Sequence, residues 1–206
     1  MTAFHSYTPS DGHGLAHNPF KALIAPRPIG WISTVSAEGV PNLAPYSYFN
    51  ALSDAPPLLM FSSSGRKHSL ENIEATGAFV HNVVSRGLAD RMNQTSGSYR
   101  NGHSEFDMAG LTPVRSDIVA PPRVAEAPAA MECRLVSITR LADASGTMTD
   151  NYMIIGEVVR IHVANELIRD GVVDQAGLHL LGRLGHIHYA AVDELISLKR
   201  PVLSER

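Results

Sequence analysis

Cysteine is almost missing from this sequence, because the 206 residues contain only Cys133. A single thiol excludes an internal disulfide, and it excludes a metal cage or an iron–sulfur cluster built from cysteines. Such sparing use of cysteine is typical of a reducing compartment, so we expect a cytoplasmic protein.

The sequence also lacks a long apolar run. No stretch approaches the roughly 18 apolar residues that are needed to cross a bilayer. The first 17 residues, MTAFHSYTPSDGHGLAH, have neither the cationic start nor the apolar centre of a secretory signal. We therefore expect no membrane association and no export.

An excess of charge is missing too. Charged residues make up 18%, the formal net charge is -3, and Lys and Arg form no run, which argues against nucleic acid as a partner. Apolar residues make up 44%, as in ordinary globular proteins. We predict a loosely structured lead-in over 1–17 and one domain over 18–206, which begins at Asn18-Pro19-Phe20.

Three common motifs of nucleotide-binding proteins and hydrolases are absent. Neither G-x-G-x-x-G, G-x-x-x-x-G-K-[ST] nor G-x-S-x-G occurs in the sequence. A Rossmann domain, a P-loop and a hydrolase nucleophile elbow are therefore unsupported. Any NAD(P)H would have to bind transiently, without a domain of its own.

What the sequence does contain is a series of β patterns. IGWISTVSAEGVPNLAPYSYF predicts a hairpin with strands at Gly30–Ser36 and Pro41–Phe49 around a Glu38-Gly39 turn. Further strands are expected in PPLLMFSSS (56–64), AFVHNVVS (78–85), MECRLVSITRLA (131–142), NYMIIGEVVRIHVANELI (151–168) and GHIHYAAV (185–192). VAPPRVAEAPAA (119–130) is interpreted as a surface connector.

Two short helices are predicted between the strands. SLENIEATG offers Ser69 as N-cap, Glu71 in the first turn and Gly77 as the stop. GLADRMNQTSG (87–97) places Leu88 and Met92 four residues apart, and a loop should follow to about residue 110. Many strands with few helices indicate a mostly β protein with flanking helices, in the form of a β-barrel.

One segment, SSSGRKHSLEN, combines hydroxyls, cations and a helix start. Hydroxyls and N–H groups donate hydrogen bonds to a phosphate, and the two cations neutralise it. The candidate residues are Ser62, Ser63, Ser64, Arg66, Lys67 and Ser69. The alternative is that the serines end a strand, the cations lie on a loop and Ser69 only caps a helix.

The neighbouring stretch, LAPYSYFNALSDAPP, combines aromatic and polar residues. A flat heteroaromatic ring needs apolar faces and a few polar groups at its edge, and a proline-kinked strand can expose backbone groups to it. The candidates are Pro45, Tyr46, Ser47, Tyr48 and Asn50, on a stretch expected beside the next strand. The alternative is an aromatic strand in the core.

With these segments, the sequence resembles the flavin reductase-like family with an FMN-binding split β-barrel (Greek-key), which includes flavoredoxins and the reductase components of two-component monooxygenases. The resemblance covers about residues 18–200, through PRPIGWISTVSAEGVPNLAPYSYFNALSDAPPLLMFS, GRKHSLENIEATGAFVHNVV, SEFDMAGLTPVRSDIVAPPRVAEAPAAMECRL and GRLGHIHYA. It implies that the flavin ring lies along 45–50 and that the phosphate falls to Ser62, Ser64, Arg66, Lys67 and Ser69.

The resemblance also implies a homodimer with each flavin near the subunit boundary, so that GRLGHIHYA would complete the partner's site. His186 and His188 would share one face of a strand, where they could approach a flavin or bind a metal, but no third ligand is identified and we predict no metal. Tyr189 could stack on the flavin or pack in the barrel. Arg27 and Trp31 belong to the PRPIGW signature, with roles left open; Trp31 could be core.

The resulting hypothesis is an oxidoreductase in which FMN, or FAD, accepts a hydride from NADH or NADPH and passes electrons to free flavin, oxygen or a partner monooxygenase. The cofactor carries the chemistry, so no catalytic side chain is assigned. Two alternatives stay open: a non-catalytic flavin-binding or electron-carrier protein, and a split-barrel enzyme for a specific organic substrate.

Overall fold

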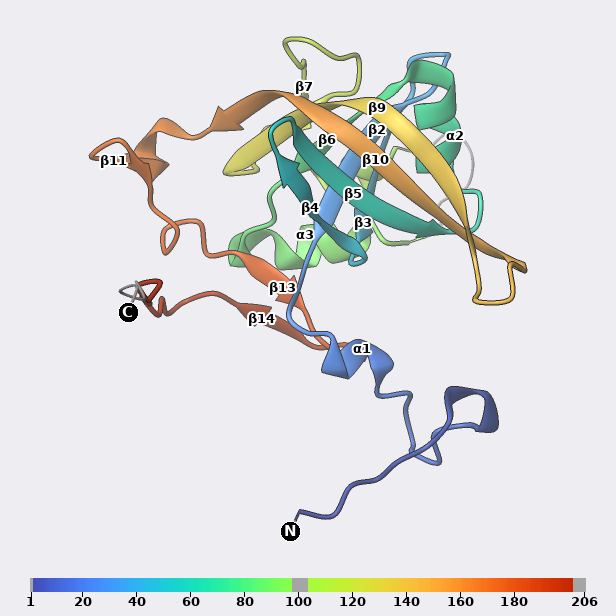
Figure 1. Ribbon diagram of the computed structural model, residues 1–206. Coiled ribbons are helices and arrows are strands. Elements are labelled where there is room, and N and C mark those ends of the chain that lie inside the picture. The colour runs from blue at the N-terminus through green and yellow to red at the C-terminus, as the bar shows by residue number, and fades with distance from the viewer. Residues whose placement is uncertain (1, 98–103, 202–206) are drawn as a thin grey trace, which may run out of the picture.

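The computed structural model describes residues 2–97 and 104–201, and a seven-stranded sheet dominates this part of the chain (Figure 1). All of its strand pairs are antiparallel. The strands follow in the order β3 (Pro41–Tyr46), β2 (Gly30–Val35), β6 (Ala78–Asn82), β9 (Ala129–Ala142), β10 (Met148–Val163), β5 (Pro57–Ser64) and β4 (Phe49–Asp54). The expected mostly β fold with flanking helices is confirmed.

The two edge strands of this sheet, β3 and β4, are consecutive in the chain. Only Ser47 and Tyr48 separate them, and three residue steps span at most about 11 Å. The sheet must therefore curl until its edges meet. At the crossing, the backbone N–H of Ser62 in β5 donates to the carbonyl oxygen of Tyr48 at 2.8 Å. Because no ladder joins the edge strands β3 and β4 to each other, the barrel stays open between the two edges of the sheet.

This crossing corrects the prediction of one strand over Pro41–Phe49. The strand that pairs with β2 ends at Tyr46, and Phe49 begins β4 at the opposite edge of the sheet. Apolar and aromatic residues continue through the crossing, although β4 is mostly exposed, with only Phe49 and Ser53 partly buried. The pattern alone therefore does not reveal the change of partner.

Two hydrophobic clusters lie on the two faces of β2. Its residues are buried on both sides, since successive side chains point to opposite faces. Ile32 belongs to the barrel interior with Phe61, Phe79 and Ile154. Trp31 belongs to the second cluster, which joins the outer face of the sheet to the helices after β6 and includes Met92, Leu88, Phe106 and Leu181.

Helix α2 (His68–Thr76) packs on β2 and β3 and closes one end of the barrel. Gly77 ends it as predicted, in a left-handed conformation with φ 68, and its N–H donates to the Ile73 carbonyl oxygen at 2.8 Å. The prediction of Ser69 as N-cap is wrong. Lys67 holds the N-cap position without a side-chain cap, and Ser69 lies buried inside the first turn.

The other helices are short. They are η1 (Pro9–Asp11), α1 (Phe20–Leu23), η2 (Arg86–Leu88), α3 (Ala89–Gln94), α4 (Glu105–Met108) and η3 (Asn165–Leu167). The predicted helix at 87–97 corresponds to η2 and α3, with Met92 and Leu88 buried as expected from their spacing. The loop expected to about residue 110 contains α4, whose Ser104 N-cap hydroxyl accepts from the Phe106 N–H.

Short strands lie outside the barrel. They form a three-stranded sheet, β1 (Arg27–Pro28), β13 (Leu181–Arg183) and β14 (Tyr189–Ala191), and two ribbons, β7 (Pro113–Val114) with β8 (Arg123–Val124) and β11 (Ile168–Arg169) with β12 (Val172–Val173). The expected surface connector is thus partly structural, because Val124 of β8 is buried in the second cluster.

Three further predicted strands are shorter than expected. The strand expected over 78–85 ends at Asn82. The strand expected over 151–168 ends at Val163, where η3 follows. The last strand contains only Tyr189–Ala191, because Leu184 and His188 close a turn before it and His186 adopts a left-handed φ of 52. His186 and His188 therefore do not share a strand face, which corrects that expectation.

The predicted lead-in over 1–17 extends away from the barrel in its described part and contains only η1 (Figure 1). Its boundary with the domain at residue 18 stays a prediction. Within 2–97 and 104–201, no helix combines the length and hydrophobicity that a membrane span requires.

Candidate functional site

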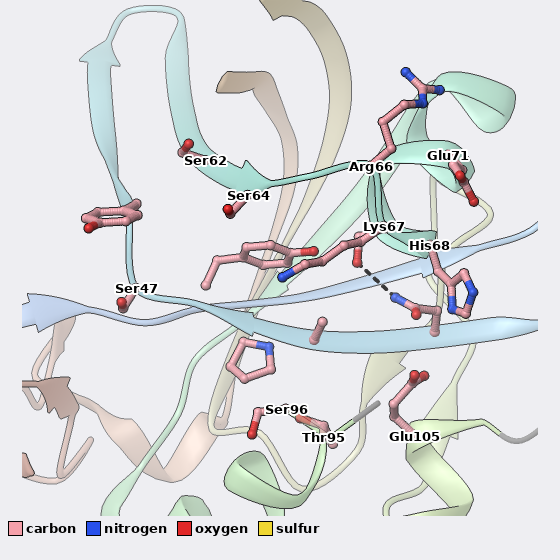
Figure 2. Close-up of a pocket in the computed structure, with 17 residues that line it drawn as sticks. Ser47, Ser62, Ser64, Arg66, Lys67, His68, Glu71, Thr95, Ser96 and Glu105 are labelled. Atoms are coloured by element: carbon pink, nitrogen blue, oxygen red, sulfur yellow. Dashed lines mark hydrogen bonds between the residues drawn. The ribbon is translucent and has the colours of Figure 1, made fainter. Parts of the chain in front are cut away.

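A cavity of about 500 Å³ lies at the opening of the barrel, and we call it the barrel-edge pocket (Figure 2). Its walls come from β3, the β3–β4 crossing, the end of β5, the start of α2, the end of α3 and the start of α4. The lining residues are Asn42, Ala44, Pro45, Tyr46, Ser47, Tyr48, Ser62, Ser64, Arg66, Lys67, His68, Ser69, Glu71, Thr95, Ser96, Gly97 and Glu105. The two segments that the sequence selected therefore meet in one cavity.

The upper wall in Figure 2 has the properties of an anion site. Ser62 and Ser64 of β5 lie above the pocket and Lys67 extends into it. Within the described residues, neither serine hydroxyl has a hydrogen-bond partner and Lys67 has no ion pair. The first N–H groups of α2 also lack a side-chain cap. These groups fit a phosphate, which accepts several hydrogen bonds and carries negative charge.

Gly65 makes this arrangement possible. Its φ of 78 lies in the left-handed region, and its N–H donates to the Asp150 carbonyl oxygen at 2.7 Å. Glycine adopts this conformation without strain. The chain can therefore leave β5 and enter α2 within a few residues, which puts the strand hydroxyls and the helix start on the same pocket.

Arg66 lies differently from the prediction. Its guanidinium points away from the pocket in Figure 2 and forms two hydrogen bonds to the Glu74 carboxylate, one of them 3.1 Å long. This partner raises the pKa of Arg66 above its usual value. The two cations are therefore not equivalent, since only Lys67 reaches into the cavity.

The floor of the pocket is a buried polar group. The Asn42 amide donates to the Ser69 hydroxyl at 3.0 Å and to the Thr34 hydroxyl at 3.2 Å, and the first of these bonds is the dashed line in Figure 2. The Tyr46 hydroxyl is buried with no hydrogen-bond partner. Its burial raises the pKa of the phenol, although the nearby Ser69 and Ser63 hydroxyls partly oppose this shift. Burial thus favours the neutral form of the phenol.

Four predicted site residues are not brought to the pocket. Ser63 is buried and its hydroxyl donates to the Gly65 carbonyl oxygen at 3.0 Å. Asn50 is exposed on β4 and its side-chain oxygen accepts from the Ala51 N–H. His188 and Tyr189 also lie outside the lining of the pocket. Strand alternation turns Ser63 inward, between Ser62 and Ser64. Tyr189 belongs to β14 in a separate sheet, and His188 lies in the turn just before it.

Eight lining residues were missed by the sequence interpretation: Asn42, Ala44, His68, Glu71, Thr95, Ser96, Gly97 and Glu105. Asn42 lies on β3, Thr95 follows α3, and Glu105 begins α4 with a carboxylate that accepts from the Leu43 N–H at 3.2 Å. The SEFDM segment lies within one of the stretches that carry the resemblance, and Ser104 followed by Glu105 is a helix-start signal that could have marked it. Nothing in the local pattern shows that this helix packs against β3.

Trp31 and Arg27 of the signature have definite places. Trp31 is fully buried, and its indole N–H donates to the Thr95 hydroxyl at 2.9 Å, so it is a core residue that also fixes one rim of the pocket. Arg27 is buried, and it donates from one end of its guanidinium to the carbonyl oxygens of Lys21 and Ile24.

A separate group of possible metal ligands has a structural explanation. Asp117, Glu132 and His162 place ligand atoms within 4.8 Å of one another. The buried Glu132 carboxylate accepts from the N–H groups of Asp117, Ile118 and Val119 and contacts His162 Nε2 at 2.7 Å. Burial alone would raise the pKa of Glu132, but these hydrogen bonds hold it below its usual value. The carboxylate is thus occupied as the anchor of the 115–119 loop.

Comparison with known proteins adds independent information. The model of the Flavin reductase like domain matches residues 23–179. Nitrilotriacetate monooxygenase component B from Bacillus cereus is 33% identical with a TM-score of 0.86, covering 96% of this chain and 100% of that one. 2-Nitrobenzoate 2-nitroreductase from Pseudomonas fluorescens is 30% identical with a TM-score of 0.79, covering 88% of each chain.

A candidate flavin reductase with a split barrel domain, from Shewanella frigidimarina NCIMB 400, has a TM-score of 0.79 at 27% identity. It covers 88% of this chain and 90% of that one. The barrel that stays open between its edge strands β3 and β4 is therefore a split barrel, as the resemblance implied.

Proposed function

Because this chain belongs to the flavin reductase-like domain family, we propose that it is an FMN-dependent oxidoreductase that takes its electrons from NADH or NADPH. Flavin-related oxidoreductase function follows from the family and its structural neighbours. The observation that carries the specific proposal is the barrel-edge pocket. Among the described residues, Lys67 has no ion pair there and the Ser62 and Ser64 hydroxyls have no hydrogen-bond partner, and these groups and the uncapped start of α2 adjoin a wall of Pro45, Tyr46 and Tyr48.

We expect one wall of the pocket to bind the flavin's phosphate and another wall to bind its ring. Lys67, Ser62 and Ser64 would hold the phosphate, together with the first N–H groups of α2. Pro45, Ser47 and Tyr48 at the β3–β4 crossing would hold the ring. When bound, the flavin supplies the redox chemistry by taking a hydride from NADH or NADPH, with release of NAD(P)⁺, and passing the two electrons to an acceptor.

The protein's own task is orientation and access. The crossing is fixed by barrel closure, and Tyr46 beneath it is locked among Phe61 and the neighbouring serines, with its ring centroid 4.6 Å from that of Phe61. A rigid wall lowers the entropy cost of placing the ring. Cys133, the only cysteine, lies in the core, and its burial raises the thiol pKa to about 12. The thiol therefore stays protonated within the core, and the proposed electron transfer does not use it.

The candidate functions differ in the molecule that accepts electrons from the reduced flavin. Similarity to a monooxygenase component B supports delivery of reduced flavin to a partner monooxygenase, which we propose as the main role. Similarity to a nitroreductase supports a second candidate, direct reduction of an organic acceptor. An electron carrier would hold the flavin and fail to turn over NADH or NADPH.

We further propose a homodimer. Several large apolar side chains outside both cavities at the crossing are exposed near both ends of the chain: Leu23, Ile24, Leu195, Ile196 and Leu198. Burying them against a second copy would be favourable. His188 and Tyr189 do not reach the pocket of their own chain, so they can serve as residues that complete the partner's site. Light scattering on the purified protein tests the dimer directly.

The test of function is anaerobic reduction of the FMN-loaded protein. We expect bleaching of the oxidised flavin band after addition of NADH or NADPH, followed by turnover when oxygen or free flavin is added. Retained flavin that neither nucleotide reduces would identify an electron carrier. Turnover with a nitroaromatic acid but not with oxygen or free flavin would favour the second candidate.

A further inference from the structure

A second cavity, of about 580 Å³, adjoins the barrel-edge pocket at the β3–β4 crossing, because Ser47 and Tyr48 line both. Its other walls come from the chain before β2 and from the turn after β13. The remaining lining residues are His17, Asn18, Phe20, Lys21, Arg27, Arg183, Leu184 and His186. We call this cavity the cationic pocket.

The charge of this pocket is one-sided. Lys21, Arg27 and Arg183 line it, and no Asp or Glu of the described residues does. None of the three has an ion pair within 2–97 and 104–201, although five other arginines do: Arg66, Arg86, Arg91, Arg160 and Arg169. The formal net charge of the chain is -3, so the local excess of cations does not reflect a basic protein.

Burial of the Arg27 guanidinium without a negatively charged partner is energetically unfavourable. It is only 6% exposed, and Nη2 donates to the Leu184 carbonyl oxygen at 2.8 Å. Nη1 donates to two further carbonyl oxygens, while Nε is buried with no partner. A buried guanidinium satisfied mainly by neutral carbonyls is desolvated without a counter-charge. An anion in the pocket would supply that charge.

The other cations are positioned by packing. The Arg183 guanidinium lies 4.4 Å from the Tyr189 ring centroid and donates to the His186 carbonyl oxygen. The Lys21 ammonium lies 5.8 Å from the Tyr48 ring centroid. A Cβ on Gly185 would come within 2.8 Å of the Ala22 Cβ, so α1 packs closely on the turn that follows β13. The pocket is therefore a built site whose cations border the crossing.

We propose that the cationic pocket binds the pyrophosphate of the NADH or NADPH that reduces the flavin. This assignment rests on the proposed function. A pyrophosphate diester carries two negative charges and several acceptor oxygens, which suits three cations better than the single charge of a carboxylate acceptor. The shared border at Ser47 and Tyr48 lets the nicotinamide reach the ring in one pocket while its phosphates stay in the other.

The experiment compares two electron donors that differ in phosphate. NADH carries the pyrophosphate, whereas 1-benzyl-1,4-dihydronicotinamide carries none. Stopped-flow reduction of the FMN-loaded full chain is measured for a Lys21→Gln/Arg183→Gln variant. The matched control is Lys199→Gln/Arg134→Gln, which removes two exposed cations outside both pockets. Calorimetric titration with ADP-ribose measures phosphate binding without any electron transfer.

The double variant should raise the dissociation constants of NADH and ADP-ribose about 100-fold, because removal of each cation should weaken binding about tenfold. The response to the benzyl donor should change far less, and the control should match the wild type. Equal losses for both donors, or ADP-ribose binding that ignores both substitutions, would overturn the pocket assignment and leave the reductase function standing. A changed oligomeric state would assign these cations to a subunit contact and would also overturn it. If neither donor reduces the wild-type protein, it is the proposed function that fails.

Discussion

The different positions of Lys67 and Arg66 lead to a quantitative prediction about flavin binding. Lys67 extends into the barrel-edge pocket, whereas Arg66 is held outside by Glu74. FMN carries a phosphate and riboflavin does not, so the ratio of their dissociation constants isolates the phosphate interaction. Replacing each cation by Ala should therefore affect FMN binding unequally and riboflavin binding hardly at all.

The size of the Lys67 effect follows from its surroundings. A hydrogen bond to a charged group contributes about 1.5–3 kcal/mol. Lys67 is an exposed residue, so water screens its interaction with the phosphate and the lower limit applies, which corresponds to roughly a tenfold rise in the FMN dissociation constant. Arg66→Ala should raise it less than about threefold, because its guanidinium is already paired with Glu74 and exposed pairs contribute little.

Fluorescence titration of the flavin-free protein measures both constants for both ligands, and the Lys199→Ala variant serves as a control for removal of an exposed lysine. The Lys67 effect should shrink as ionic strength rises, since salt screens the charges. Equal weakening of FMN and riboflavin by Lys67→Ala would refute the placement of the phosphate. A larger effect from Arg66→Ala than from Lys67→Ala would refute the assignment of roles.

Two further predictions concern stability. Burial lowers the pKa of His81 to about 4 from an ordinary value of 6.5, so the unfolded chain takes up the proton first as pH falls. The free energy of unfolding should therefore decline between about pH 6.5 and pH 4 by on the order of 3 kcal/mol. Urea titrations at a series of pH values should show that His81→Phe lacks this part of the decline. A Cβ on Gly156 would lie 2.4 Å from a ring carbon of Phe79, so Gly156→Ala should lower the free energy of unfolding by about 1–3 kcal/mol, and an unchanged urea midpoint would contradict that packing.

The sequence predicted most of the barrel because its strands have strong local signals. The pair formed by β9 and β10 is β-branched along its length and is joined by a turn rich in Gly, Asp and Ser, so both its existence and its partner were predictable. The crossing at Ser47 and Tyr48 was not. Its position depends on the closure of a seven-stranded sheet, which is a global property that no window of sequence contains.

In the candidate site too, residues with a local sequence signal were predictable and residues placed by tertiary packing were not. Ser62, Ser64 and Lys67 were predictable because strand end, glycine turn and helix start are adjacent in sequence. Ser63 lies outside the pocket by one position of strand alternation, and Arg66 lines the pocket but its guanidinium is bound by Glu74 of α2. Glu105 was missed because only tertiary packing brings α4 against β3.

The β3–β4 crossing connects the fold to the proposed chemistry. Two residues must carry the chain from one edge of the sheet to the other, so their backbone is confined between β3 and β4, where the Ser62 N–H also donates to the Tyr48 carbonyl oxygen. The same two residues separate a pocket suited to a flavin from a pocket with unpaired cations. Under the proposed function, a donor and a flavin that meet at this crossing need no nucleotide-binding domain, because the curling of the sheet has already fixed the wall between the two pockets. The absence of a dinucleotide motif from the sequence is therefore compatible with a dinucleotide substrate.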